Sequence, residues 1–111
     1  MDDPEVHRAV VAAVREGRTV ALATVVGTRG SVPRHVGSKM VIDPGVALIG
    51  TIGGGCGEAD VIAAAEEVVR TRTPRLMRVE LLDPVDSWSP AVCGGVMEVF
   101  LEPVVPGPEP A

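Results

Sequence analysis

The sequence predicts an α/β (α+β) domain, in which one mixed β-sheet of about five strands carries two main helices in the order α-β-β-β-α-β-β. The chain has 111 residues, which is the size of one compact domain. Hydrophobic residues make up 46% of it, with one Phe, one Trp and no Tyr, so the core is expected to be aliphatic. Two segments have helical apolar spacing, and short β-branched segments separate them.

The first helix is expected to begin at Asp3-Pro4-Glu5, where a capping acid precedes a Pro at the first helical position, and to end at Gly17. The second is expected over residues 58–72, with acids at its start, arginines at its end and Thr73-Pro74 after it. The apolar stripes are Val6, Val10, Ala13 and Val14 in the first helix and Val61, Ile62, Ala65, Val68 and Val69 in the second.

Strands are expected where β-branched residues cluster without helical spacing. Asp43-Pro44-Gly45 predicts a turn that joins two of them in a hairpin. The Gly and Pro content of residues 27–37 predicts an irregular loop. Residues 1–103 are expected to form the domain, and the Pro-rich residues 104–111 to form a flexible tail. The five strands are predicted at residues 19–26, 38–43, 47–52, 76–82 and 96–101.

Composition limits the classes of function. The net charge is −5, from 15 acids and 10 bases, which argues against nonspecific nucleic-acid binding. No apolar run approaches the ~18 residues of a membrane span, and the first ten residues do not resemble a signal peptide. We therefore expect a cytoplasmic protein with no membrane or nucleic-acid partner. Two cysteines in such a protein favour small buried side chains over a structural disulfide.

One segment is basic although the protein as a whole is acidic. Between Gly17 and Ile42 there is no acidic residue. The planar guanidinium of an arginine can donate two parallel hydrogen bonds to a phosphate or a carboxylate, so this segment could bind an anion. A solvated loop with incidental charge is the alternative. The bases of the segment are Arg18, Arg29, Arg34 and Lys39.

The segment TIGGGCGE, residues 51–58, lies between an expected strand and an expected helix. It matches neither G-x-G-x-x-G nor a P-loop. A Gly-rich strand-to-helix turn presents free N–H groups to an anion, and a helix start lowers the pKa of a thiol such as Cys56. The alternative is a tight turn with Cys56 buried beside it.

A second Cys-Gly element, VCGG at residues 92–95, precedes the last strand. If the sheet brings the three segments to one edge, Cys56, Cys93, Glu58 and the basic loop would line one cleft. A metal site that adds His35 to these residues is a weaker interpretation, because the cysteines lack paired spacing. No Ser-His-Asp order or carboxylate pair stands out.

Together, GTRGSVPRHVGSKM, IGTIGGGCGEADV and VCGGVMEVFLEPV resemble the amino-terminal domain of the XdhC/CoxI family, whose members are maturation factors for xanthine and carbon monoxide dehydrogenases. The resemblance runs from about Val20 to Pro103. It implies a cofactor-binding chaperone rather than a turnover enzyme. Such proteins bind molybdenum cofactor (molybdopterin or its dinucleotide form), support its sulfuration by a cysteine desulfurase and insert it into the apo-molybdoenzyme. A homo-oligomer is also compatible with the family.

The family motif maps onto three sets of positions in this chain. Two positions depart from it: Gly53 stands where the family more often has Ser, and Gly57 where it has a larger apolar residue. The carboxy-terminal Rossmann-like domain of many members is absent, so a separate chain could supply it. The matching positions are Gly30, Ser31, Pro33, Arg34, Gly37, Lys39 and Met40, then Gly54, Gly55, Cys56 and Glu58, and then Cys93, Gly94 and Gly95.

The resemblance and the residue chemistry suggest roles for these positions. Ser31, the two bases Arg34 and Lys39, and the glycines Gly53, Gly54, Gly55, Gly94 and Gly95 would bind the cofactor, with Gly53–Gly55, Arg34 and Lys39 at its phosphate. Cys56 and Cys93 would face the molybdenum and dithiolene as soft ligands or guards, and Glu58 would cap N–H groups or act on a proton. Two alternatives stay open: a thiol redox or metal-binding module that uses the cysteines, and a non-catalytic adaptor between apoenzyme and desulfurase.

Overall fold

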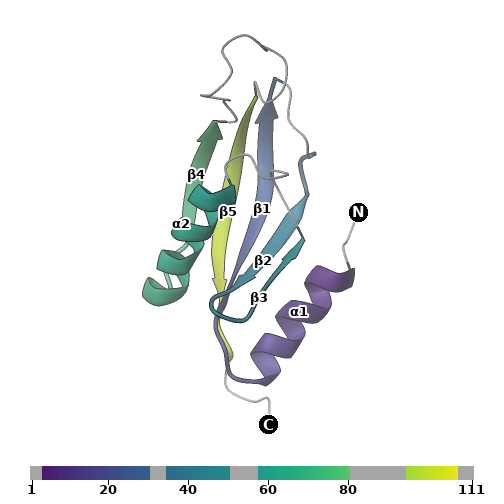
Figure 1. The fold of residues 1–111 in the computed structure, drawn as a ribbon, viewed down its shortest axis with the longest axis vertical. Coiled ribbons are helices and arrows are strands. Elements are labelled where there is room, and N and C mark those ends of the chain that lie inside the picture. Colours follow the sequence, from purple (N-terminus) through teal and green to yellow (C-terminus); the bar gives the residue numbers. More distant parts are fainter. Residues whose placement is uncertain (1–3, 31–34, 51–57, 81–94, 108–111) are drawn as a thin grey trace.

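Seven elements follow one another in the predicted order α-β-β-β-α-β-β, as a computed structural model shows (Figure 1). It describes residues 4–30, 35–50, 58–80 and 95–107. In this part of the chain no helix is long and apolar enough to cross a membrane. The elements are α1 (Pro4–Arg15), β1 (Val20–Arg29), β2 (Lys39–Asp43), β3 (Ala47–Gly50), α2 (Glu58–Thr71), β4 (Arg75–Glu80) and β5 (Val96–Val104).

The five strands form one sheet in the order β3-β2-β1-β5-β4. The predicted fold class and the number of strands are confirmed, but every neighbouring pair is antiparallel, so the sheet is not mixed. The reason is the position of β5. The last strand of the chain enters between β1 and β4 and runs opposite to both, so these two similarly directed strands never pair with each other.

The two helices cover opposite faces of the sheet, because successive side chains of a strand point to opposite sides. In β1, Ala21 and Ala23 pack in the larger cluster beneath α2, whereas Val20 belongs to the cluster beneath α1. The α2 cluster contains Met97, Val99 and Leu101, which alternate along the last strand and therefore share one of its faces. Helix α1 covers only the β2–β3 side of its face, together with the lower part of β1.

Strand β1 is longer than the sequence predicted. The prediction of a loop beginning at Gly27 is wrong, because β1 continues to Arg29 and its pairing with β5 reaches the pair Arg29↔Val96. A register shift between Val25 and Gly27 places one extra residue in β1, which is the geometry of a β-bulge. Val26 is the residue without a partner in this ladder, and Gly27 directly follows it; a glycine inside a strand often marks a bulge. At its other end the ladder reaches Val20↔Val104, so β5 extends past the predicted Leu101.

A charged pair joins the end of α1 to the turn between β2 and β3. The Arg18 guanidinium donates from Nη2 to Asp43 Oδ2 at 2.9 Å and from Nε to both carboxylate oxygens at 3.2–3.3 Å. Asp43 is 8% exposed. The bonds from Arg18 to Asp43, and then to the exposed Glu16, raise the pKa of Arg18. The contact therefore links the connection between α1 and β1 to the end of β2, next to the pair Ala21↔Ile42.

We expect Asp43→Asn to lower the midpoint of thermal unfolding, because it keeps the shape of the side chain but removes the charge that accepts from Arg18. Glu16→Gln is the matched control, since it removes the other carboxylate in contact with Arg18. An exposed pair contributes little to stability, so the control midpoint should stay close to that of the unchanged protein. Equal decreases in the two variants would contradict a structural role for the buried pair.

Candidate functional site

The segments that flank all three predicted motifs lie at one end of the sheet. Strands β1, β3 and β4 end there, and β2 and β5 begin there, because neighbouring strands are antiparallel. The ends of β1 and β4 and the start of β5 are visible at the upper end of Figure 1. The topology therefore brings the described flanks of the three motifs to one end of the sheet, while most of the motif residues themselves lie outside the described residues.

Two sets of strand contacts connect these flanks. At the tip of the sheet, Val96, which follows VCGG, pairs with Arg29 of the basic segment on one side and with Glu80 on the other. Nearer the centre, Met40 pairs with Gly50, the residue before TIGGGCGE. Two residues of the basic segment, Arg29 and Met40, therefore pair with residues that flank the two Cys-Gly motifs.

Hydrogen bonds close the basic segment near the bulge of β1. The Val25 N–H donates to the Ser38 carbonyl at 2.9 Å, and the Gly37 N–H donates to the Val25 carbonyl at 2.7 Å. Gly37 has a φ of +98°, in the left-handed region that favours glycine. These bonds fix the spacing between β1 and the start of β2, and hence the position of Lys39.

Gly50 is a residue of structural importance that the motif analysis missed. Its φ is +85°, and a β-carbon there would lie 2.6 Å from the Lys39 carbonyl oxygen and 3.3 Å from Val6 Cγ2. Only glycine fits where β3 approaches both β2 and α1 this closely. The chain therefore enters TIGGGCGE from a position at which no side chain is tolerated.

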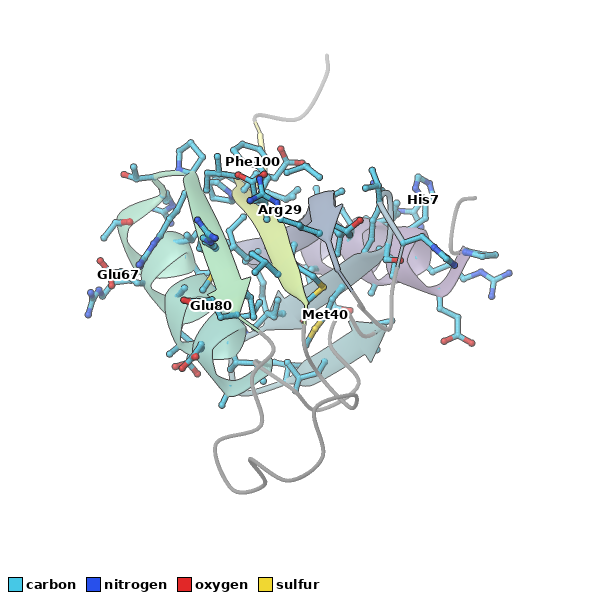
Figure 2. The ribbon with its side chains drawn as sticks, turned by 90° about the horizontal axis from the view of Figure 1, so that it is seen from above. His7, Arg29, Met40, Glu67, Glu80 and Phe100 are labelled. Atoms are coloured by element: carbon cyan, nitrogen blue, oxygen red, sulfur yellow. The ribbon has the colours of Figure 1, made fainter. Side chains whose placement is uncertain are left out.

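A pocket of about 160 Å³ lies at the same end of the sheet. Gly27, Glu98 and Arg78 are neighbours on three adjacent strands and face away from α2. Arg29 lies on this face as well; in Figure 2 it is on the same side of β5 as Phe100 and opposite Met40 of the α2 cluster. The pocket is lined by Gly27, Thr28, Arg29, Arg78, Val96 and Glu98.

The charged groups of this pocket do not neutralise one another. Within the described residues, neither Arg29 nor Arg78 has an ion-pair partner. Glu98 is the cross-strand partner of Arg78, but its carboxylate lies over Gly27, where Oε1 would be 2.9 Å from an added β-carbon. The pocket thus holds two arginines and one displaced carboxylate, in a protein whose net charge is −5.

The structure describes some of the predicted site residues. Lys39 is half-buried at the start of β2, Gly95 is buried before β5, and Glu58 begins α2. His35, considered as a metal ligand, is exposed, and no group of three or more His, Cys, Asp or Glu in the described ranges could hold a metal ion. The predicted roles of eight residues lie outside the described residues: Ser31, Arg34, Gly53, Gly54, Gly55, Cys56, Cys93 and Gly94.

Sequence reasoning did not select Arg78 and Glu98 as site residues. Both belong to strands, where a charged residue usually indicates only a solvated position, and they become neighbours only when β4 pairs with β5. A weak signal was available for Glu98, which alternates with the apolar Met97 and Val99 directly after VCGG. No local signal connects Arg78 with Arg29.

Comparisons with known proteins agree on one family. Residues 13–80 match the XdhC and CoxI family. The chain is 36% identical over 81 residues to the uncharacterized protein YqeB of Escherichia coli (strain K12), covering 73% of this chain and 15% of YqeB. It is 31% identical over 100 residues to a probable xanthine dehydrogenase subunit of Bacillus subtilis (strain 168), covering 86% of this chain and 30% of that protein.

A solved structure has the same fold. A crystal structure of a xanthine dehydrogenase from Bacillus halodurans superposes with a TM-score of 0.71 at 28% sequence identity, covering 87% of this chain and 30% of that chain. The chain therefore spans less than a third of the length of each of these relatives.

We expect Gly50→Ala to lower the free energy of unfolding by at least about 2–3 kcal/mol, because the new β-carbon adds a backbone clash to an unfavourable φ. Gly45→Ala is the matched control. Gly45 has a φ of +76° but no atom within 4 Å of its added β-carbon, so only the cost of the left-handed conformation, about 1 kcal/mol, should appear. Denaturant unfolding measures both, and equal losses would contradict the clash.

Proposed function

Because the chain belongs to the XdhC and CoxI family, we propose that it binds molybdenum cofactor and assists its sulfuration and its insertion into an apoenzyme of the xanthine or carbon monoxide dehydrogenase type. Molybdopterin or its dinucleotide form is the cargo, and a cysteine desulfurase supplies the sulfur. The observation that carries the proposal is the convergence of the flanks of all three motifs at one end of the sheet.

One described cation suits the phosphate end of this cargo. Lys39, which the proposal places at the phosphate, lies at the start of β2, at the convergent end of the sheet. Phosphate oxygens accept charge-assisted hydrogen bonds from such groups. In the proposal, the backbone of Gly53–Gly55 and the side chain of Arg34 add further donors to this end.

The molybdenum and dithiolene end needs soft donors. Thiolate is such a donor, and the proposal assigns this end to Cys56 and Cys93, as ligands or as guards against oxidation. Glu58, the first residue of α2, would cap N–H groups of the glycine turn or hold a proton near the metal. Gly95, which is buried directly before β5, would keep the backbone beside Cys93 free of side chains.

A holding and delivery role fits these residues better than catalytic turnover. The described part of the convergent end contains cations, a displaced carboxylate and glycines, but no histidine paired with a nucleophile. The names of two relatives point to a xanthine dehydrogenase system as the partner. Since the chain covers less than a third of each of them, another chain or domain would supply the remaining steps of delivery.

We expect Cys56→Ala and Cys93→Ala each to reduce retention of molybdopterin after reconstitution, because each removes a soft donor near the metal. Retention is measured by the fluorescence of the oxidised pterin after gel filtration. Ala59→Ser, a similarly small change on an exposed position of α2, is the control. Circular dichroism and the unfolding midpoint establish that each variant is folded. Unchanged retention in both folded cysteine variants would contradict the roles of the cysteines.

The same preparations separate the alternatives. A reversible disulfide between Cys56 and Cys93 after mild oxidation, with no pterin bound, would favour a thiol redox module. A bound metal without pterin would favour a metal-binding module. Retained capture of apoenzyme and desulfurase by a chain that binds no pterin would favour a non-catalytic adaptor. Each of these results contradicts the cofactor-binding proposal.

A further inference from the structure

We propose that the pocket between β1, β5 and β4 is a binding site for a phosphate group, in which Arg29 and Arg78 hold the anion from two sides. Arg29 belongs to the basic segment but was not among the residues expected at the cofactor's phosphate, and Arg78 lies outside all the sequence motifs. The proposal does not depend on molybdenum cofactor being the ligand, because it concerns only the charge and shape of the pocket.

The position of Glu98 is the first argument. Directly opposed residues on antiparallel strands are close enough to form an ion pair, and Arg78 and Glu98 are opposed in this way. The Glu98 carboxylate instead lies over Gly27 on the other neighbouring strand. It can do so because Gly27 has no side chain. Among the described residues Arg78 therefore has no ion-pair partner, and its guanidinium can bind an external anion.

The two arginines flank the pocket from different strands. Arg29 is the last residue of β1 and Arg78 is on the edge strand β4, with β5 between them. Their side chains are exposed, so an anion can reach them from solvent. Two guanidinium groups outweigh the single carboxylate, and together they present a fork of donors that matches phosphate oxygens.

The size of the pocket agrees with this ligand. Its volume of about 160 Å³ is about that of five water molecules in the liquid, which is enough for a phosphate group. Thr28 supplies one more hydroxyl at the lining.

Glu98 has a defined effect in this proposal. Its carboxylate repels an anion that enters beside it, so it weakens binding while Arg29 and Arg78 strengthen it. Removing the charge of Glu98 should therefore change affinity in the opposite direction to removing the charge of either arginine. A general loss of folding would weaken binding in every variant, so it cannot make one variant bind more tightly and another less tightly.

The test is a titration of the full chain with inorganic phosphate and with cytidine monophosphate, followed by amide chemical shifts. Arg29→Gln and Arg78→Gln should each weaken binding of both probes by roughly tenfold, as the loss of one charge-assisted hydrogen bond predicts. Arg70→Gln is the matched control, since it removes the same charge from the last turn of α2, outside the lining of the pocket. It should bind like the unchanged protein, and binding should weaken as salt is added.

Glu98→Gln should strengthen phosphate binding severalfold, with the largest shifts in the residues that line the pocket. Tighter binding of the monophosphate than of phosphate would identify an ester as the preferred form, and the reverse order a free anion. The proposal is overturned if Arg29→Gln and Arg78→Gln bind like Arg70→Gln, or if Glu98→Gln weakens binding. Either failure would leave the cysteine experiments on molybdopterin unaffected.

Discussion

The pairing of β1 with β5 is the contact on which the rest of the structure depends. Its ladder runs from Val20↔Val104 to Arg29↔Val96 and forms the centre of the sheet. Strand β4 pairs only with β5, and the core beneath α2 needs side chains from both central strands. Because β5 is the last element of the chain, the central sheet cannot be complete until the final strand has been added. This long-range closure carries an entropic cost before its contacts form.

The same pairing creates the pocket. Helix α1 covers only part of its face, beside β2 and β3, and leaves the outer parts of β1, β5 and β4 exposed. There the sheet carries Glu98 between Gly27 and Arg78, where the opposite face carries the buried Met97 and Val99. One face of β5 therefore stabilises the fold while the other presents charged groups to solvent. This is possible because successive side chains of β5 point to opposite faces of the sheet.

Sequence patterns predicted the helices and strands well, because the spacing of apolar residues depends on the local backbone conformation. The stripes Val6–Val14 and Val61–Val69 have helical spacing, and both helices lie where the stripes indicated. The extension of β1 past Gly27 was missed because glycine usually marks a loop, and only the ladder with β5 reveals the bulge. Strand order was not predictable, since nothing near Arg29 indicates that Val96 pairs with it.

The candidate site, like the fold, was predictable only where neighbouring residues in the sequence determine it. The motifs identified which segments carry the chemistry, but not the residues that other strands bring to them. Gly50 was one of several glycines in the sequence, and its importance comes from the Lys39 carbonyl and Val6 side chain that enclose it. Arg78 resembled a solvated strand residue until Glu98, its cross-strand neighbour, was found over Gly27.

Charged side chains are arranged differently at the two ends of the sheet. At the end with the β2–β3 turn, Arg18 and Asp43 satisfy each other and join α1 to the sheet. At the motif-bearing end, Arg29 and Arg78 have no such partner among the described residues. The pocket therefore carries more positive than negative charge although the protein is acidic. A phosphate ligand gives both arginines a partner at the end of the sheet where the described flanks of the family motifs meet.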